Sequence, residues 1–214
     1  LGESRYFFPD QFGDLVDLCW LRGMIVTSGP TGSGKTTTMY ELARKLSQTK
    51  MVMTIEDPVE VYEESFFQAQ VNAGAGISYA SLLKAALRHR PDALIIGEIR
   101  DEETAHLAVD AALSGHLVLA TVHAKSTYQT ISRLESLGVK NNELVNCLTA
   151  VSYQRLLPGK KGPACLLDLA SREDLLAALG QSVRGNFAAW EENLSRLVEK
   201  GEISADVARQ YKGG

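Results

Sequence analysis

The stretch SGPTGSGKTTTMYEL, residues 28–42, decides how this chain folds. Within it, residues 29–36 match the pattern G-x-x-x-x-G-K-[ST] in full, after an apolar run at residues 24–28 and before a helical pattern. Small residues let a backbone wrap closely around phosphate groups, and the positive end of the following helix adds to the attraction. The sequence therefore predicts a phosphate-binding loop between a buried strand and a helix.

Each position of this loop has an expected role. We expect Lys35 to neutralise charge on the β- and γ-phosphates and the Thr36 hydroxyl to hold Mg²⁺. The predicted phosphate-binding residues are Gly29, Pro30, Thr31, Gly32, Ser33, Gly34, Lys35, Thr36 and Thr37, with Thr36 as the metal-binding residue. The loop alone predicts a nucleoside triphosphate and leaves open the process that it drives.

Apolar runs alternate with helical patterns along most of the chain. Strands are expected at residues 24–28, 51–56, 66–72, 93–98 and 116–123, and helices at 10–20, 36–46, 78–88, 101–113 and 126–137. Several of these strands are apolar at consecutive positions, as strands buried on both faces must be. The pattern predicts an α/β fold with a largely parallel sheet flanked by helices.

The character of the sequence changes after residue 141. Residues 142–157 read as a helix that runs into a strand, PGKKGP at 158–163 as a hairpin loop, and 164–169 as the returning strand. Three further helices are expected at 174–179, 187–199 and 204–211. We therefore expect an ATPase-like core at 1–157, and a hairpin with a small helical subdomain at 158–214.

Glu98 ends the apolar run PDALIIGE, at the edge where a parallel sheet presents ligands. An acidic side chain there is costly unless it has a partner or a task. We interpret Glu98 as the general base that orients or deprotonates water. The alternative is a strand-terminal residue that pairs with Arg100.

A second acidic group, TIEDPVE at residues 54–60, follows another predicted strand. Pro58 stops that strand and fixes the turn that presents the carboxylates. Glu56 or Asp57 could bind a Mg²⁺-linked water or align the nucleophile. For Asp57 and Glu60 a solvated acidic turn is the alternative.

The run GHLVLATVHA places His116 and His123 at the two ends of one predicted strand. Seven residues span roughly 23 Å along a strand, so the two imidazoles cannot bind one metal ion. His123, at the carboxyl end, could approach the γ-phosphate and sense its presence. A purely structural histidine is the alternative.

Composition limits the possible ligands and settings. The chain of 214 residues has 22 basic and 26 acidic residues, a net charge of −4, which disfavours nucleic acid as the main ligand. No run approaches the ~20 apolar residues that span a bilayer. The three cysteines form no CxxC pair, which excludes a Cys-rich zinc site within this chain and favours small buried residues.

Four motifs in order resemble the secretion ATPase superfamily of type II secretion and type IV pili. GPTGSGKTTTMYEL, TIEDPVE, RPDALIIGEIRD and GHLVLATVHA match the family's Walker A, Asp box, Walker B and His box, and QRL at 154–156 extends the match. The resemblance implies a RecA-like ATPase core, a homo-hexameric ring, and ATP with Mg²⁺. It also implies Glu98 as the Walker B catalytic acid, Glu56 as its Asp-box helper, and His116 and His123 as the His-box pair.

The resemblance further implies a cytoplasmic motor, peripherally associated with the membrane, that acts on a membrane platform protein and a pilin fibre. The chain has no four-cysteine insertion and no AIRNLIRE-like ending, and its short tail looks most like the compact assembly ATPases of Gram-positive competence pili. Because residue 1 is Leu and not Met, we expect a piece of a longer protein that lacks the family's N-terminal domain. That domain supplies arginines to the phosphates in the assembled ring.

The function predicted is an ATP-hydrolysing motor for a type IV pilus-like or pseudopilus fibre, in secretion or competence DNA uptake. One alternative is a DNA-translocating or conjugation-type ATPase that acts directly on nucleic acid. The acidic balance and the absence of a basic stripe count against it. Another is a regulatory subunit that binds nucleotide without catalysis, against which the intact Lys35, Thr36 and Glu98 argue.

Overall fold

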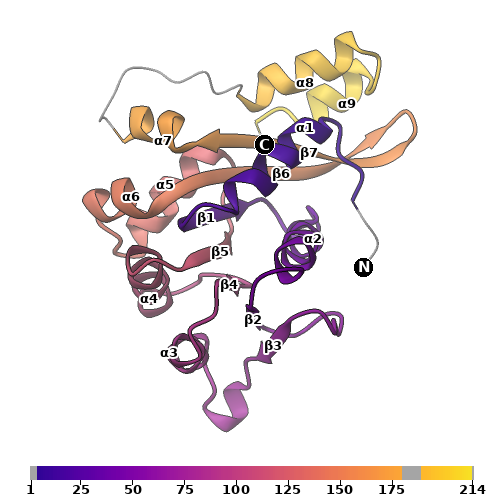
Figure 1. Cartoon of the computed structure of the whole chain (residues 1–214). Coiled ribbons are helices and arrows are strands. Elements are labelled where there is room, and N and C mark those ends of the chain that lie inside the picture. The colour runs from indigo at the N-terminus through magenta and orange to yellow at the C-terminus, as the bar shows by residue number, and fades with distance from the viewer. Residues whose placement is uncertain (1–3, 180–188, 214) are drawn as a thin grey trace.

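In the computed structural model, which describes residues 4–179 and 189–213, seven strands form one sheet in the order β3-β2-β4-β5-β1-β6-β7 (Figure 1). Neighbouring strands from β3 to β6 run parallel, and β7 runs antiparallel beside β6. The predicted α/β fold with a largely parallel sheet is therefore confirmed.

The elements follow the predicted alternation closely. The strands are β1 (Gly23–Ser28), β2 (Val52–Glu56), β3 (Phe67–Gln70), β4 (Ala93–Ile96), β5 (Leu117–Val122), β6 (Leu148–Gly159) and β7 (Gly162–Ser171). The helices are α1 (Pro9–Leu18), α2 (Lys35–Ser47), α3 (Tyr79–Arg88), α4 (Glu102–Leu113), α5 (Thr127–Ser136), α6 (Asn141–Cys147), α7 (Arg172–Ala178), α8 (Trp190–Glu199) and α9 (Ala205–Gln210), with a 3₁₀ turn at Ala73–Ala75.

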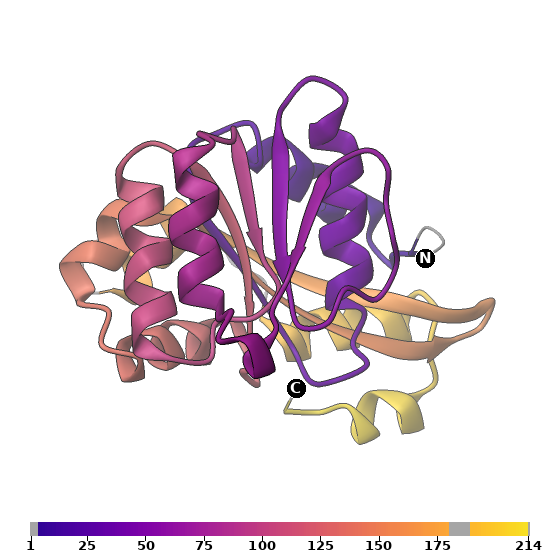
Figure 2. The same cartoon turned by 90° about the horizontal axis from the view of Figure 1, so that it is seen from below.

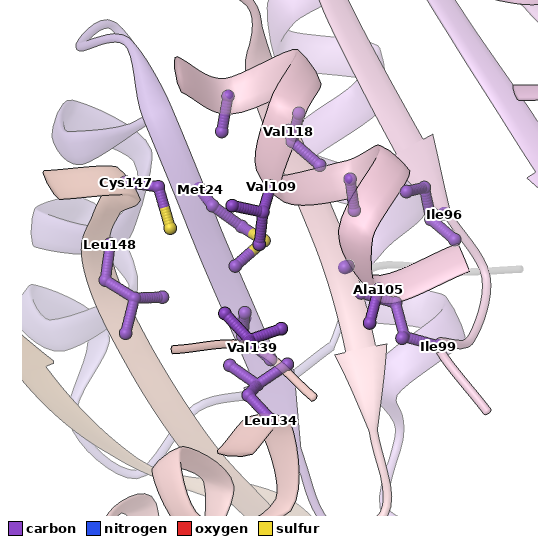
Figure 3. Close-up of a cluster of buried hydrophobic side chains, with 14 of the residues drawn as sticks. Met24, Ile96, Ile99, Ala105, Val109, Val118, Leu134, Val139, Cys147 and Leu148 are labelled. Atoms are coloured by element: carbon purple, nitrogen blue, oxygen red, sulfur yellow. The ribbon is translucent and has the colours of Figure 1, made fainter. Parts of the chain in front are cut away.

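Helices cover both faces of the sheet, as Figure 2 shows. On one face α1 and α2 pack against a core that includes Ile25 and Leu119. On the other face α3 to α6 pack against a larger core, part of which Figure 3 shows. Every residue of β1, β4 and β5 is buried, which explains why these strands are apolar at consecutive positions.

Side-chain caps fix the starts of α3 and α4. The Asp101 carboxylate accepts a hydrogen bond from the Thr104 N–H at 2.8 Å at the start of α4. Ser78 caps α3 and forms a capping box with Ser81. Strand β4 ends at Ile96, earlier than the predicted boundary at residue 98, so Glu98 lies on the loop that follows the strand.

The three cysteines are buried, as predicted. Burial raises the pKa of Cys19, of Cys147 and of Cys165 to about 12 in each case. Their thiols therefore stay protonated and pack as small apolar groups.

The C-terminal part packs on the far end of the sheet. The predicted hairpin is present, because β6 and β7 pair from Ala150 to Ser171 around the turn at residues 160–161. Helices α8 and α9 pack on this hairpin through a third apolar cluster that includes Tyr153 and Trp190. The predicted division at residue 157 stays a prediction, and β7 beyond it completes the common sheet. Residues 187–188 of the predicted helix 187–199 lie outside the described residues.

A buried acid joins β7 to α8. The Asp168 side chain accepts a hydrogen bond from the Asn193 amide at 2.6 Å, and both residues are almost fully buried. Burial raises the pKa of Asp168 from 3.8 to about 7, partly opposed by the Asn193 hydrogen bond. Between pH 4 and 7 the unfolded chain has therefore released a proton that the folded chain retains.

This difference predicts that stability falls as pH rises through that window. Replacing Asp168 by Asn removes this titration. Between pH 5 and pH 7 the free energy of unfolding of the parent should therefore fall by about 2–3 kcal/mol relative to that of Asp168→Asn. Urea unfolding followed by circular dichroism at several pH values measures it. Exposed Asp110→Asn on α4 is the control. Parallel pH curves for Asp168→Asn and the parent would contradict the prediction.

Candidate nucleoside triphosphate site

The glycine-rich loop between β1 and α2 adopts a backbone that requires its glycines. Gly29, Gly32 and Gly34 have φ values of 149°, 76° and 88°, which side-chain-bearing residues rarely adopt. A Cβ added to Gly29 would lie 2.3 Å from the Gln154 carbonyl oxygen of β6. The loop thus turns tightly over the sheet edge and leads directly into the N-terminus of α2, as a phosphate cradle requires.

Lys35, the first residue of α2, lies over this cradle. Its ammonium group donates to the carbonyl oxygens of Gly29 at 2.7 Å and Pro30 at 2.9 Å. Burial lowers the pKa of Lys35, and the nearby Glu98 acts in the opposite direction. The loop therefore holds a cation where an anionic ligand would replace weak carbonyl partners with phosphate oxygens.

Thr36 contacts the acidic turn after β2. Its hydroxyl donates to Glu60 Oε1 at 3.2 Å. The turn is fixed from outside, because Val59 N–H donates to Gln70 at 3.0 Å and Gln68 donates to the Val61 carbonyl at 2.9 Å. A hydroxyl beside a carboxylate is a suitable oxygen donor set for Mg²⁺ and its bound waters.

Glu98 lies between two basic side chains. Arg100 donates to Glu98 Oε2 through Nε and Nη2, both at 2.7 Å, and His123 Nε2 lies 3.1 Å from Glu98 Oε1. Arg100 Nη1 also lies 3.6 Å from Asp57 Oδ2. The Glu98 hydrogen bond raises the pKa of Arg100, which keeps the guanidinium charged. The pairing of Glu98 with Arg100 that the alternative interpretation predicts is therefore present. Glu98 also lines the same cavity as the phosphate loop.

These groups share one cavity of about 480 Å³ at the carboxyl edge of the sheet. The sequence-predicted residues that line it are Thr31, Gly32, Ser33, Gly34, Lys35, Thr36, Thr37, Glu56, Asp57, Glu60, Glu98 and His123. The structure therefore brings together the phosphate loop, the acidic turn, Glu98 and His123. Their catalytic and binding roles stay predictions.

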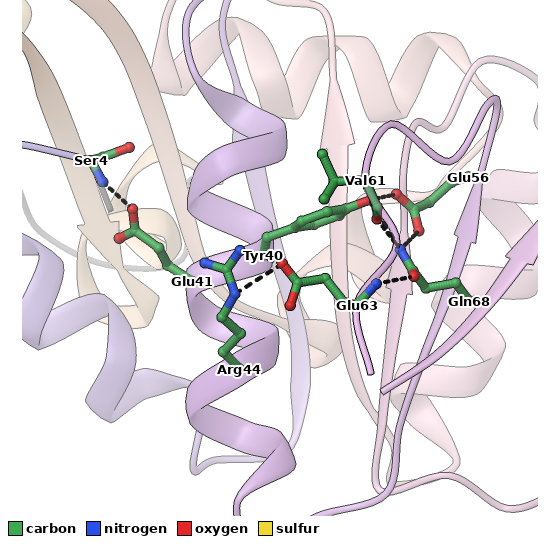
Figure 4. A network of polar contacts seen from close by, with 8 residues as sticks. All are labelled: Ser4, Tyr40, Glu41, Arg44, Glu56, Val61, Glu63 and Gln68. Carbon is green, nitrogen blue, oxygen red and sulfur yellow. Dashed lines mark hydrogen bonds and ion pairs between the residues drawn. The ribbon is translucent and has the colours of Figure 1, made fainter. Parts of the chain in front are cut away.

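Glu56 lines this cavity, but its carboxylate is held by hydrogen bonds. Figure 4 shows its contacts with Tyr40 and Gln68. Glu56 is almost fully buried, and it accepts hydrogen bonds from Tyr40 of α2, from Thr54 at 2.6 Å and from Gln68 of β3 at 3.1 Å. Burial, followed by the Glu56 hydrogen bond, raises the pKa of Tyr40, so this phenol remains a donor. The network ties α2, β2 and β3 together beside the phosphate loop. The catalytic helper role of Glu56 stays a prediction.

His116 lies at the opposite edge of the sheet. It precedes β5, and its Nδ1 lies 3.2 Å from the Ala111 carbonyl oxygen, beside a separate cavity that Trp20 and Arg22 line. The structure thus separates the two histidines, in line with the argument from strand length.

Three cavity-lining or loop-contacting groups had no predicted role. Tyr79 lines the cavity from the start of α3, and burial raises its pKa to about 12. For Arg100 the sequence predicts only a pairing with Glu98. Gln154, noted only as part of QRL, donates from Nε2 to the Ser33 carbonyl at 3.0 Å. In the sequence, only the IRD and QRL motifs indicate Arg100 and Gln154.

Comparison with known proteins adds to this geometry. The family model described as "Type II/IV secretion system protein" matches residues 15–189. The chain belongs to this family. It is 44% identical over 210 residues to the competence protein ComGA of Streptococcus pneumoniae, covering 98% of this chain and 63% of that protein. It is 48% identical over 158 residues to ComGA of Bacillus subtilis, covering 72% of this chain and 44% of that protein.

The chain thus spans 63% and 44% of the lengths of these two relatives. A solved structure described as the pilus retraction motor PilT with bound ADP matches it with a TM-score of 0.78 at 30% identity, covering 94% of this chain and 64% of that one. The predicted resemblance to secretion and pilus ATPases, with the RecA-like fold that it implies, is confirmed.

The Tyr40–Glu56 contact predicts a measurable loss of stability in this family member. Tyr40→Phe leaves a buried carboxylate short of one donor, which should lower the free energy of unfolding by about 2 kcal/mol. Urea unfolding at pH 7 measures the change. Tyr62→Phe is the matched control, because Tyr62 is 79% exposed and should tolerate the loss of its hydroxyl. Equal stabilities of the two variants would contradict the assignment.

Proposed function

We propose that the chain is a Mg²⁺-dependent ATPase. One observation carries this proposal: Lys35 of the phosphate loop and Glu98, on the loop that follows β4, line the same cavity. A cation for the phosphates and an acid for the water are the two groups that phosphoryl transfer to water needs most. The glycine conformations and the hydroxyl–carboxylate pair of Thr36 and Glu60 also fit a magnesium–triphosphate ligand.

Each side chain has a step in this proposal. Lys35 exchanges its two carbonyl partners for β- and γ-phosphate oxygens and stabilises charge that develops there. Thr36 would hold Mg²⁺, which would supply positive charge beside the phosphates when bound. Glu98 orients the attacking water and accepts its proton, while Arg100 and His123 fix the carboxylate from either side. His123 is also near enough to the cavity to respond to the γ-phosphate.

We infer that this ATPase drives a type IV pilus-like assembly system, of the kind used for competence. The Streptococcus pneumoniae relative that matches 98% of this chain is a competence protein, and other relatives are type II secretion proteins. The working form proposed is a homo-hexameric ring at the cytoplasmic face of the membrane, in contact with a platform protein. No helix among the described residues is long and apolar enough to cross a membrane.

The first test is removal of the loop cation. Lys35→Ala should lower the rate of Mg²⁺-dependent ATP hydrolysis about 100-fold or more, because the phosphate charge loses its main partner. Lys45→Ala, an exposed residue of the same helix, should retain the parent rate. Phosphate release measures both. A Lys35→Ala protein that hydrolyses ATP at the parent rate would exclude this site as the ATPase centre.

Glu98 can be tested separately from binding. Glu98→Gln keeps the shape of the side chain but removes the base, so kcat should fall about 10²- to 10⁴-fold while ATP affinity stays within a few-fold. Calorimetric titration and steady-state hydrolysis give the two quantities. Glu102→Gln, exposed at the start of α4, is the control. If Glu98→Gln lost ATP binding but kept kcat, Glu98 would act in binding ATP and not in activating the attacking water.

A further inference from the structure

Gln154 lies on β6 directly beneath the phosphate loop. It is fully buried, and its Nε2 donates to the Ser33 carbonyl oxygen at 3.0 Å. A Cβ on Gly34 would lie 3.3 Å from the same Nε2, and one on Gly29 would lie 2.3 Å from the Gln154 carbonyl oxygen. The loop therefore rests on this one residue through its side chain and through its backbone.

Two buried polar atoms at this contact are unsatisfied. Gln154 Oε1 and Ser33 Oγ have no hydrogen-bond partner among residues 4–179 and 189–213. The Ser33 carbonyl fixes the amide orientation, because only the NH₂ group can donate to it. A buried group without a partner costs free energy, so a loop conformation that joins the Ser33 hydroxyl to Gln154 Oε1 would be favoured.

The other face of the same strand contacts the C-terminal helices. Because side chains alternate along a strand, the neighbours of Gln154 point away from the loop. The Tyr153 ring packs edge-on against Trp190 of α8, with ring centroids 5.0 Å apart. The Arg155 guanidinium lies 4.6 Å from the ring centroid of Tyr211, just after α9. Trp190 Nε1 in turn donates to the Tyr211 carbonyl at 2.8 Å, which joins α8 to the end of α9.

We propose that Gln154 is a positioning residue that couples occupancy of the phosphate loop to helices α8 and α9. Phosphate binding draws the loop backbone toward the ligand, the Ser33 hydroxyl then donates to Gln154 Oε1, and β6 moves the Tyr153 and Arg155 contacts on its other face. This inference rests on the proposed nucleotide site. It adds an output of that site, carried by the pair of helices at the far end of the sheet.

The chain contains its own reporter for this coupling. It has two tryptophans, Trp20 and Trp190, so a Trp20→Phe background leaves Trp190 as the only indole. In that background, saturating Mg²⁺-ADP should change the Trp190 emission. Gln154→Met, which keeps the side-chain volume but removes the amide, should abolish the change at saturating nucleotide. Ser33→Ala should abolish it as well, and it removes one of the two unpaired buried groups without creating a new one.

Binding is measured in parallel by calorimetry. Each single variant should weaken ADP binding about tenfold. The double variant should weaken it no further, because each single variant already removes the proposed hydrogen bond from the Ser33 hydroxyl to Gln154 Oε1. Gln129→Met, an exposed glutamine of α5, should retain both the fluorescence change and the affinity. Circular dichroism and urea unfolding establish that each variant is folded.

The possible failures are distinguishable. If the parent binds ADP but Trp190 does not respond, the coupling is wrong while the nucleotide site stands. The same holds if Gln154→Met and Ser33→Ala respond as the parent does, or if their effects on binding are fully additive. If the parent does not bind ADP, the proposed function itself fails.

Discussion

The close contact between the phosphate loop and strand β6 is the constraint on which the rest of the site depends. Gly29 lies against the Gln154 backbone so closely that no side chain fits there. This contact holds the loop over the edge at which β1, β2, β4 and β5 all end. Because parallel strands present their carboxyl ends at one edge, every side chain that follows one of these strands is brought near the loop.

Charge balance explains how so many acids can share this edge. Glu56 has three hydrogen-bond donors, Glu60 has Thr36, and Glu98 has Arg100 and His123. Acids left unpaired beside a site for phosphate would repel the ligand as well as each other. Instead the structure gives each of these three acids donors from its own surroundings, and the hydrogen bonds of the Lys35 ammonium go to the carbonyl oxygens of Gly29 and Pro30. The Lys35 ammonium at the loop is therefore not hydrogen-bonded to a carboxylate among the described residues, which suits an anionic ligand.

Most of the fold and the composition of the site could be predicted from the sequence. The phosphate loop is a contiguous stretch of sequence. Strands buried on both faces appear as continuous apolar runs, so the strands at residues 24–28 and 93–96 could be predicted without knowing which strands lie beside them. The contacts of Glu56 and Gln154 could not be predicted. They depend on which side chains lie opposite across α2, β3 and β6, and no periodicity within a single segment encodes that pairing.

The register between β2 and β4 accounts for the different positions of the two glutamates. Ile55 pairs with Ile96 at the end of the register, and a Cβ on Gly97 would lie 3.4 Å from the Glu56 Cα, so Glu56 lies beside Gly97. Since side chains alternate along a strand, Glu56 turns toward α2 and is satisfied there, whereas Asp57 and Glu98 share Arg100. A Cβ on Gly97 would lie 3.1 Å from both the Ile55 carbonyl oxygen and the Tyr79 hydroxyl, so a side chain at the position opposite Glu56 would require its neighbours to shift. Asp57 is thus the residue of the acidic turn that shares Arg100 with Glu98, whereas Glu56 is held by its own hydrogen bonds to α2 and β3, and the helper role of Glu56 stays a prediction.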